Sequence, residues 1–357
     1  MKLLTATTLA SLLLVTSLNA AQLKVPRQYP DIGAAIAAAG PGDEVVISAG
    51  TYREYVILNG SAGVTVRGKG KVFIRPTTEG SAIQILDCGG VTVENLRVRD
   101  CVSNGVVISG SQNIQVEKCD IRDAGTSGIS VIASHDVLLD RNTIQRTGSA
   151  AIKVNSYGVV VRKNKISDLT GAVPGITVTG HNNVIEQNVL SKMAYNGIVV
   201  SSSGVPAHLL IADNLAKVGN VGISLNVGVE NVTVAGNRIL DSGSTGIQVL
   251  GGSSLAVFDN LVNGGDDGLS LLADDSMIAR NRAVRCHNGV LFTGDDCDLH
   301  GNKMLRSENT GFRLGLGSER NLISSNVMKK SGGFDLALYA DPMDNDLVDN
   351  QFKTVGP

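Results

Sequence analysis

A short motif of the form Gly-Ile-x-Val recurs along the chain at nearly even intervals. The spacing between copies runs from 21 residues (Gly268 to Gly289) to 25 residues (Gly197 to Gly222). A period in this range predicts a solenoid, in which each repeat packs only against its two neighbours. The copies begin at Ala82, Gly105, Gly128, Ala151, Gly175, Gly197, Gly222, Gly246, Gly268, Gly289, Gly311 and about Gly333.

The second and fourth residues of the motif are apolar in the clear copies, as in Ile129 and Val131 or Ile198 and Val200. This alternation of mostly β-branched residues predicts a strand with one buried face. Three short strands per coil, each paired in parallel with the same strand of the next coil, would form a right-handed parallel β-helix. We therefore predict an all-β, single-domain β-helix of about twelve coils.

An asparagine follows most motif copies at a similar distance. Stacked asparagines can hydrogen-bond one another and the backbone, and asparagine tolerates the left-handed conformation that a sharp bend requires. The sequence therefore predicts an asparagine ladder, in which Cys119 replaces asparagine once. Its expected members are Asn95, Asn142, Asn164, Asn188, Asn214, Asn237, Asn260, Asn281, Asn302, Asn326 and Asn350.

The first residues, MKLLTATTLASLLLVTSLNAAQ, have the pattern of a secretory signal peptide over residues 1–21. No later apolar run reaches the roughly 18 residues of a membrane-spanning helix, so we expect an exported protein, periplasmic or extracellular, without a transmembrane segment. Residues 22–43 are predicted to form an N-terminal cap, with Asp31 capping a short helix from Ile32 to Ala39, and residues 44–357 to form the β-helix.

Composition narrows the range of partners. The formal net charge is −2 and the basic residues are scattered along the sequence, which argues against nucleic acid. Aromatic residues make up only 3% and tryptophan is absent, which argues against a binding platform for neutral glycans. The five cysteines lack CxxC spacing, so we interpret them as buried thiols, although export would permit a disulfide. We expect a monomer that binds an acidic polysaccharide.

The segment YPDIGAAIAAAGPGDEVVISAGTYREYVIL, residues 29–58, resembles the entry segment of the pectate-lyase-like superfamily of secreted β-helix proteins. The repeats that follow resemble the generic right-handed β-helix repeat of the same superfamily. This resemblance implies the fold but no single reaction, because lyases, polygalacturonases, esterases, epimerases, phage tailspikes and periplasmic maturation factors all share it.

In this superfamily the outward residues of the first strand and its flanking turns usually form the ligand groove. The corresponding positions here are mostly polar and uncharged, and Lys153 is a charged exception. We predict that Lys153 acts as a base or neutralises a substrate carboxylate. The candidate substrate-binding residues around it are Ser130, Asn155, Thr177 and Thr179.

Three titratable residues, His135, Tyr157 and His181, occupy nearly equal offsets in the turns of consecutive coils. They should therefore stack within about two coil rises. β-Elimination from a uronate needs a base for the C5 proton, an acid for the leaving oxygen and a cation for the carboxylate, and Lys, His and Tyr can fill these roles. The alternative is that all three are solvated turn residues of a non-enzymatic binding, maturation or structural protein.

Two aspartate pairs, Asp274/Asp275 and Asp295/Asp296, occupy the same offsets in adjacent coils. Like charges roughly 5 Å apart repel, and a bound cation would reverse the sign of that interaction. We predict a calcium site formed by these four residues, because calcium prefers clustered carboxylate and carbonyl oxygens. The alternative is that the aspartates only stabilise tight turns.

A third pattern is similar to polygalacturonases, with Asp266 and Asp267 before one first strand, His287 in the next coil and Arg313 in the one after. The resemblance implies a catalytic role for Arg313. Gly315 stands where that family has lysine, and its upstream aspartate has no counterpart, so an inverting hydrolase would lack one of its two carboxyl groups. A glycoside hydrolase of this kind is a minor alternative.

Overall fold

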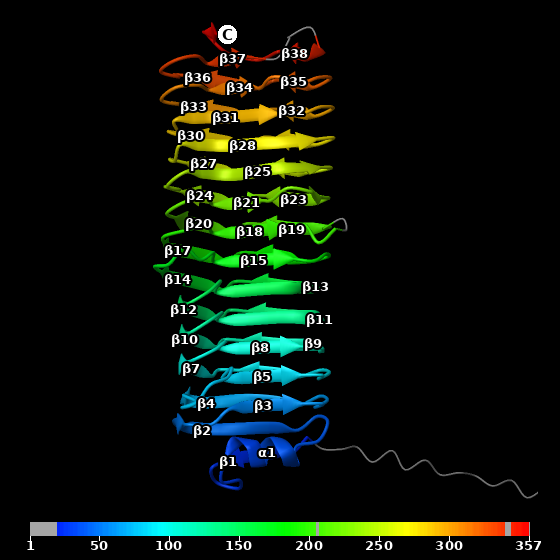
Figure 1. Cartoon of the computed structure of the whole chain (residues 1–357), viewed down its shortest axis with the longest axis vertical. Coiled ribbons are helices and arrows are strands. Elements are labelled where there is room, and N and C mark those ends of the chain that lie inside the picture. The colour runs from blue at the N-terminus through cyan, green and yellow to red at the C-terminus, as the bar shows by residue number, and fades with distance from the viewer. Residues whose placement is uncertain (1–19, 205–206, 340–343, 357) are drawn as a thin grey trace, which may run out of the picture.

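The computed structural model describes residues 20–204, 207–339 and 344–356. The predicted signal peptide, residues 1–21, lies outside the described residues except for its last two. The described residues form a single sheet of 39 strands, wound into about 14 turns (Figure 1). The prediction of a right-handed parallel β-helix is confirmed, but the predicted number of coils is slightly too low.

The coil count was too low because the first coils lack the motif. The helical stack begins with β1 (Gln22–Val25), β2 (Glu44–Tyr52), β3 (Val56–Asn59) and β4 (Thr65–Ile74), all of which precede Ala82. Val45 of β2 pairs in parallel with Leu23 of β1 and with Val66 of β4. These coils are held by the same pairing without a Gly-Ile-x-Val sequence.

The first strand of each coil from the Ala82 copy to the Gly311 copy carries the motif and buries its second and fourth residues, whereas in the last two coils Leu338 is half-buried and Val355 is exposed. Ile129 and Val131, for example, pair with Ile152 and Val154 of the next coil and lie in the core. These strands are β5 (Ile83–Leu86), β8 (Val106–Ser109), β11 (Ile129–Asp140), β13 (Ile152–Arg162), β15 (Ile176–Thr179), β18 (Ile198–Ser201), β21 (Ile223–Leu225), β25 (Thr245–Ser253), β28 (Asp267–Asp274), β31 (Asn288–Thr293), β34 (Phe312–Leu314), β37 (Leu336–Leu338) and β39 (Val355–Gly356).

The second strands follow a turn, and in β11 and β13 the two strands merge into one. They are β6 (Thr92–Glu94), β9 (Gln112–Glu117), β16 (Val184–Glu186), β19 (Leu209–Ala212), β23 (Val232–Ala235), β26 (Ala256–Phe258), β29 (Met277–Ala279), β32 (Asp298–His300), β35 (Leu322–Ser324) and β38 (Asp346–Val348). The short β22 (Val229–Glu230) lies in the turn before β23.

The third strands form the remaining face, at the left of Figure 1. They are β7 (Arg97–Cys101), β10 (Asp120–Ala124), β12 (Thr143–Thr147), β14 (Lys165–Leu169), β17 (Val189–Met193), β20 (Leu215–Val218), β24 (Arg238–Leu240), β27 (Leu261–Asn263), β30 (Arg282–Val284), β33 (Lys303–Leu305) and β36 (Val327–Lys329).

The asparagine ladder is confirmed from Asn142 to Asn350 and runs along the bend between the second and third strands. At a typical rung, the side-chain amide of Asn237 donates to Asn260 Oδ1 at 3.0 Å and to the carbonyl of Ile211 at 2.8 Å. Asn95 is not a member. It lies one position earlier, with φ of 58°, and buried Leu96 occupies the ladder position of that coil.

A second ladder, which the sequence analysis did not predict, lines the turn between the first and second strands. Ser134 Oγ accepts a hydrogen bond from the Ser111 amide and Ser156 Oγ accepts one from the Ser134 amide, each at 3.1 Å. Towards the C-terminus, Asn321 Oδ1 accepts from the Cys297 amide at 2.9 Å. Small polar side chains thus satisfy the turn amides that the strands leave without partners.

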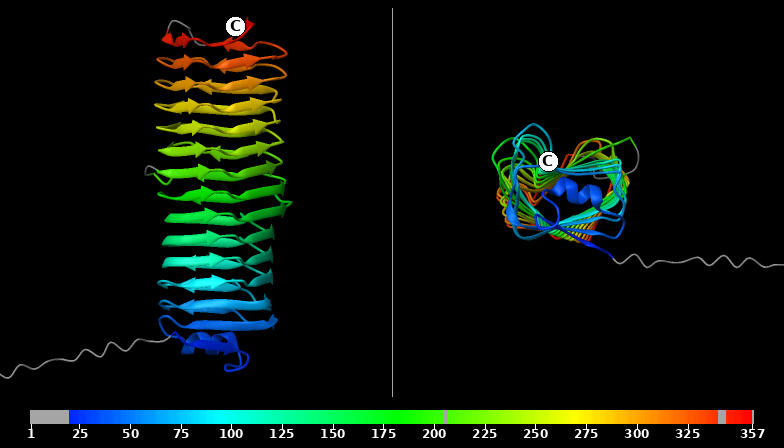
Figure 2. Two further views of the ribbon diagram at one scale, coloured as in Figure 1. Left: turned by 180° about the vertical axis from the view of Figure 1, so that it is seen from behind. Right: turned by 90° about the horizontal axis from the view of Figure 1, so that it is seen from below.

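The N-terminal end of the core is covered by α1 (Ile32–Ala38), which lies across the end of the coil stack (Figure 2). Asp31 caps this helix by accepting a hydrogen bond from the Ala34 amide at 2.7 Å, as predicted. The helix ends one residue before the predicted Ala39. Ile32 and Ala35 are fully buried, so the helix closes an end that would otherwise expose apolar residues.

Candidate functional site

His135, Tyr157 and His181 form a continuous stack of rings. The ring centroids of His135 and Tyr157 lie 5.2 Å apart with an interplanar angle of 11°, and those of Tyr157 and His181 lie 5.2 Å apart with an angle of 7°. The spacing is close to the coil rise of about 4.8 Å, because each ring comes from the same turn of a successive coil. The predicted stacking of these three residues is confirmed.

A β-bulge brings His135 into this column, although its offset from the motif is one residue longer than that of the other two rings. The register between β11 and β13 shifts between Ile132 and His135, and Ala133 adopts a left-handed φ of 46°. After the bulge His135 pairs with Tyr157. The His135 Nδ1 atom lies 2.9 Å from Asp136 Oδ2, which orients the ring and selects its tautomer.

Lys153 and Asn155 precede Tyr157 on the outward face of β13. The Cα atoms of Lys153 and Tyr157 are separated by at most about 14 Å, the reach of four extended residues. Within the part of the chain that the structure describes, Lys153 makes no hydrogen bond or ion pair. No hydrogen bond or ion pair therefore joins the lysine to the ring stack, and a ligand that contacts both would lie over Asn155.

The predicted substrate-binding residues lie beside Lys153 and Asn155. Thr177 pairs with Lys153 and Thr179 pairs with Asn155 in the next coil. Ser130 pairs with Lys153 from the preceding coil but is only 4% exposed, so its hydroxyl offers little surface to a ligand. Lys153, Asn155, Thr177 and Thr179 thus form a polar surface, here called the polar floor, which is bounded on one side by the three rings.

Beyond His135, towards the N-terminus, the turn is hollowed into a shallow groove. His135, Gln112 and Asp87 line it, and its floor is rich in glycine. A Cβ atom on Gly110 would lie 2.3 Å from Asp87 Oδ1, so the carboxylate rests directly over this glycine. Sequence reasoning missed Asp87, although it occupies the same turn, one position after the strand β5 ends.

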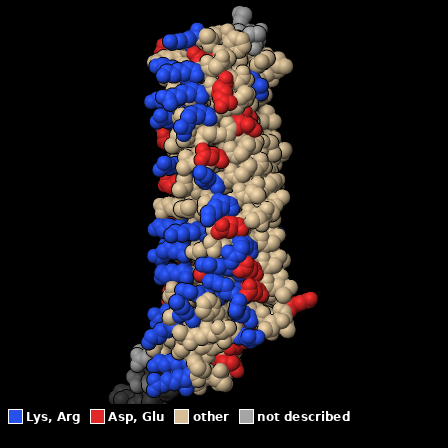
Figure 3. Space-filling view, turned by 90° about the vertical axis from the view of Figure 1, so that its left-hand side faces the viewer, with Lys and Arg blue, Asp and Glu red and all other residues tan. Residues whose placement is uncertain are grey.

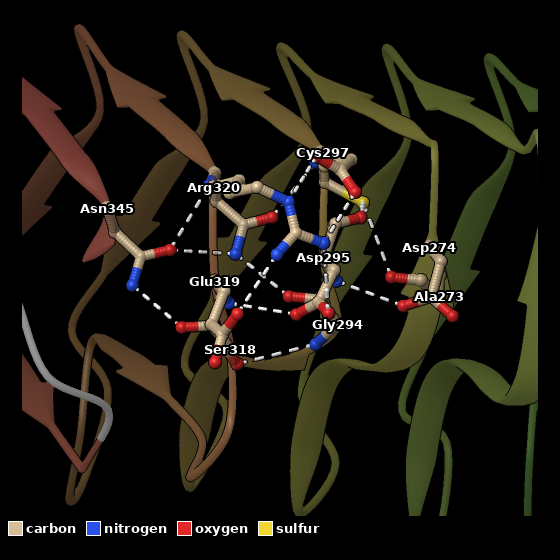
Figure 4. Close-up of polar contacts among 11 residues, drawn as sticks. Ala273, Asp274, Gly294, Asp295, Cys297, Ser318, Glu319, Arg320 and Asn345 are labelled. Carbon is tan, nitrogen blue, oxygen red and sulfur yellow. Dashed lines mark hydrogen bonds and ion pairs between the residues drawn. The ribbon is translucent and has the colours of Figure 1, made fainter.

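The aspartate pairs occupy the same turn of adjacent coils, where the Asp275 amide donates to the Asp295 carbonyl at 3.0 Å. Figure 4 shows that Asp274 and Asp295 already form hydrogen bonds with neighbouring residues. Asp274 Oδ1 accepts from the Asp295 amide at 2.9 Å, and Asp295 Oδ1 accepts from the Glu319 amide at 2.8 Å. Arg320 binds both oxygens of Asp296 at 2.8 Å and approaches Asp295 Oδ2 at 3.4 Å.

The guanidinium of Arg320 therefore supplies positive charge to Asp295 and Asp296, the charge that a calcium ion was predicted to supply. It holds the pKa of Asp296 below its ordinary value through the hydrogen bonds between the two side chains. Within the described ranges, no group of three or more His, Cys, Asp or Glu residues is arranged to hold a metal ion. A calcium ion at Asp295 and Asp296 would have to compete with Arg320, whereas Asp275 retains free carboxylate oxygens.

Arg313 lies many coils from the ring stack and does not contribute to the same site. Its guanidinium carbon lies 5.9 Å from the centroid of the Tyr339 ring, beside a groove that also includes Leu272 and Thr293. His287 approaches Glu308, with 3.4 Å between Nδ1 and Oε2, and Asp267 accepts a hydrogen bond from Asn288.

The parallel coils, the two ladders and the polar turn column define a right-handed parallel β-helix protein. The family model described as "Right handed beta helix region" matches residues 81–239 and 221–356. The chain belongs to this family. A comparison with curated proteins finds no significant match.

Solved structures share this fold at low sequence identity. The A-module of the mannuronan C-5 epimerase AlgE6 of Azotobacter vinelandii is 16% identical, with 89% of this chain and 93% of that chain covered and a TM-score of 0.60. A mannuronic acid-specific polysaccharide family 6 lyase from human gut microbiota is 14% identical, with 92% and 87% covered and a TM-score of 0.53. The Dettilon tailspike protein is 14% identical, with 88% and 65% covered and a TM-score of 0.65.

None of the helices in the described part of the chain is both long and apolar enough to cross a membrane.

Proposed function

We propose that this protein is an exported, monomeric β-helix protein that binds an acidic polysaccharide and cleaves it by β-elimination. The stack of His135, Tyr157 and His181 beside the polar floor of Lys153 carries the proposal. Two of the structures with the same fold are named as enzymes that act on mannuronate polymers, which supports a uronate as the substrate class.

The proposed reaction assigns the three chemical roles to different parts of the site. A uronate bound over Asn155 would place its carboxylate towards Lys153, whose ammonium neutralises the charge that develops when the C5 proton leaves. A histidine of the stack accepts that proton, and the Tyr157 hydroxyl donates a proton to the departing glycosidic oxygen. The products are a new chain end and a sugar with a C4–C5 double bond.

Calcium stays a prediction for the aspartate pairs. Asp274 and Asp275 keep oxygens free of Arg320, and turn carbonyls are close by, so these two residues are the more suitable half of the predicted site. A calcium ion there would lie far from the ring stack along the rod. Its contribution would be to the stability of the C-terminal coils and not to the elimination step.

The proposal can be tested by incubating residues 22–357 with pectate, alginate and glycosaminoglycans, in the presence of calcium or a chelator. The ultraviolet absorbance of unsaturated uronate ends is then measured over time. We expect the absorbance to rise with at least one polymer. If no polymer gives a signal and no new reducing ends form, the non-enzymatic alternative is correct. The signal should be the same with calcium and with the chelator, and its loss with the chelator alone would contradict the assignment of calcium to stability only.

A further inference from the structure

The third-strand face of the rod is rich in basic side chains, although the basic residues are scattered along the sequence (Figure 3). Near the C-terminal end this face carries a group of exposed cations from three consecutive coils, which we name the C-terminal basic face. It consists of Arg282, Arg285, Lys303, Arg306, Lys329 and Lys330.

The parallel register places these cations in columns along the rod. Arg282 pairs with Lys303 at the start of the third strand. Arg285, Arg306 and Lys330 follow the ends of β30, β33 and β36, with left-handed φ angles of 55°, 59° and 65°. Neighbours within a column are therefore about one coil rise, roughly 4.8 Å, apart.

Earlier coils combine acidic and basic residues in the same corner column. Arg146 binds Asp123 at 2.6 Å, and Lys192 approaches Asp168 to 3.7 Å. In the last coils the acidic members are missing. Across the described residues, no cation of the C-terminal basic face has an acidic partner within 4.0 Å, and the side chain of Arg285 only donates to Asn263 Oδ1 at 3.1 Å.

We infer that the C-terminal basic face binds a linear polyanion, an acidic polysaccharide that lies along the rod axis. Charge complementarity supports this partner, because the columns repeat positive charge along a line and arginine can bind a carboxylate through two parallel hydrogen bonds. The face would hold the polymer at a distance from the ring stack. The choice of an acidic polysaccharide rests on the proposed function.

Two other polyanionic partners fit less well. Single-stranded nucleic acid usually stacks its bases on aromatic side chains, and β30, β33 and β36 carry none. A membrane surface usually requires exposed apolar anchors, and none of the large exposed apolar residues of the described chain belongs to these strands.

The test compares two triple variants of residues 22–357. Arg285→Gln/Arg306→Gln/Lys330→Gln removes one column, and glutamine is acceptable there because Gln187 already adopts a φ of 55°. Lys24→Gln/Lys69→Gln/Lys71→Gln removes the same charge at the opposite end of the rod. Binding of fluorescein-labelled alginate oligosaccharides is measured by anisotropy, alongside labelled single-stranded DNA and anionic phospholipid vesicles. Circular dichroism verifies that each variant is folded.

The first variant should bind the alginate probe roughly tenfold more weakly than the wild type, and the control variant within about twofold of it. The inference would be overturned if the first variant bound alginate as tightly as the wild type, or if both variants bound it equally weakly. It would also be overturned if the wild type bound only the DNA or the vesicles. A protein that binds through this face but cleaves no polymer would contradict only the proposed elimination.

Discussion

At the scale of single residues, the repeat places each side chain next to the equivalent side chain of the neighbouring coil. Cysteines at the inward positions of these columns are therefore buried. Cys119 and Cys297 occupy ladder positions, and the Cys119 thiol donates only weak hydrogen bonds, to the carbonyls of Val93 and Glu117. All five cysteines are free and buried. Burial raises the pKa of Cys119 to about 12 and that of Cys101 to about 11.

These thiols should be inert in the folded protein. At pH 8 the thiolate fraction is very small for Cys101 and Cys119, whose pKa values are raised, and burial within the packed coils keeps the reagent away from all five thiols. We expect almost no reaction of the native protein with a disulfide reagent such as Ellman's, and reaction of five thiols after unfolding in guanidinium. Rapid labelling of the native protein, or fewer than five thiols after unfolding without reductant, would contradict this expectation.

Residue offsets predicted the ring stack, because rings at nearly equal offsets in consecutive coils must lie in one column. The same reasoning did not predict that Arg320 binds Asp295 and Asp296. Arg320 comes from the following coil at the same turn, where the sequence reads Glu319-Arg320 in place of an aspartate pair. Comparing a whole column, and not only its residues of one charge, would have found this partner.

At the scale of the elements, the asparagine ladder holds the bend between the second and third strands in every coil from Asn142 onwards. Each buried rung uses its carbonyl oxygen for the neighbouring asparagine and its amide for a backbone carbonyl. The cost of removing a rung is high because the partners it leaves behind are buried and cannot reach water.

Asn237→Ala should therefore lower the free energy of unfolding by roughly 2–4 kcal/mol. The variant loses the hydrogen bonds to Ile211 and Asn260 and leaves the Asn214 amide without its acceptor. Urea unfolding followed by circular dichroism measures the shift. Asn309→Ala, at an exposed position with one side-chain hydrogen bond, is the control and should change stability by less than about 0.5 kcal/mol. Equal effects of both substitutions would show that the ladder is not a main source of stability.

The sequence pattern identified the elements well where the motif is regular and less well elsewhere. Asn95 has the expected spacing but lies one residue before the ladder position, in the left-handed bend. Asparagine is favourable in both places, so the residue type alone does not distinguish them. The Ser, Cys and Asn residues of the second ladder differ in type, so no single letter repeats and no sequence period reveals them. These residues share only a small side chain with a hydrogen-bonding atom. Their alignment in one column is visible only in the three-dimensional structure.

At the scale of the whole molecule, the rod separates two surfaces that the proposed function would use together. The ring stack lies in the turns after the first strands of the coils that contain β11, β13 and β15, near the middle of the rod, whereas the C-terminal basic face lies on the third strands near the C-terminal end (Figure 1). α1 closes the N-terminal end of the core between residues 32 and 38. A long rigid scaffold of this kind can bind a polymer at one place and act on it at another.

One rate comparison tests whether the ring stack performs the elimination. The initial rate of unsaturated uronate formation on the most reactive polymer is measured for the wild type, Tyr157→Phe and Tyr195→Phe, since Tyr195 is a tyrosine with 36% exposure in a different turn. We expect Tyr157→Phe to be slower by about a hundredfold or more, the usual contribution of a proton donor, and Tyr195→Phe to be unchanged. Equal rates for Tyr157→Phe and the wild type would contradict this expectation.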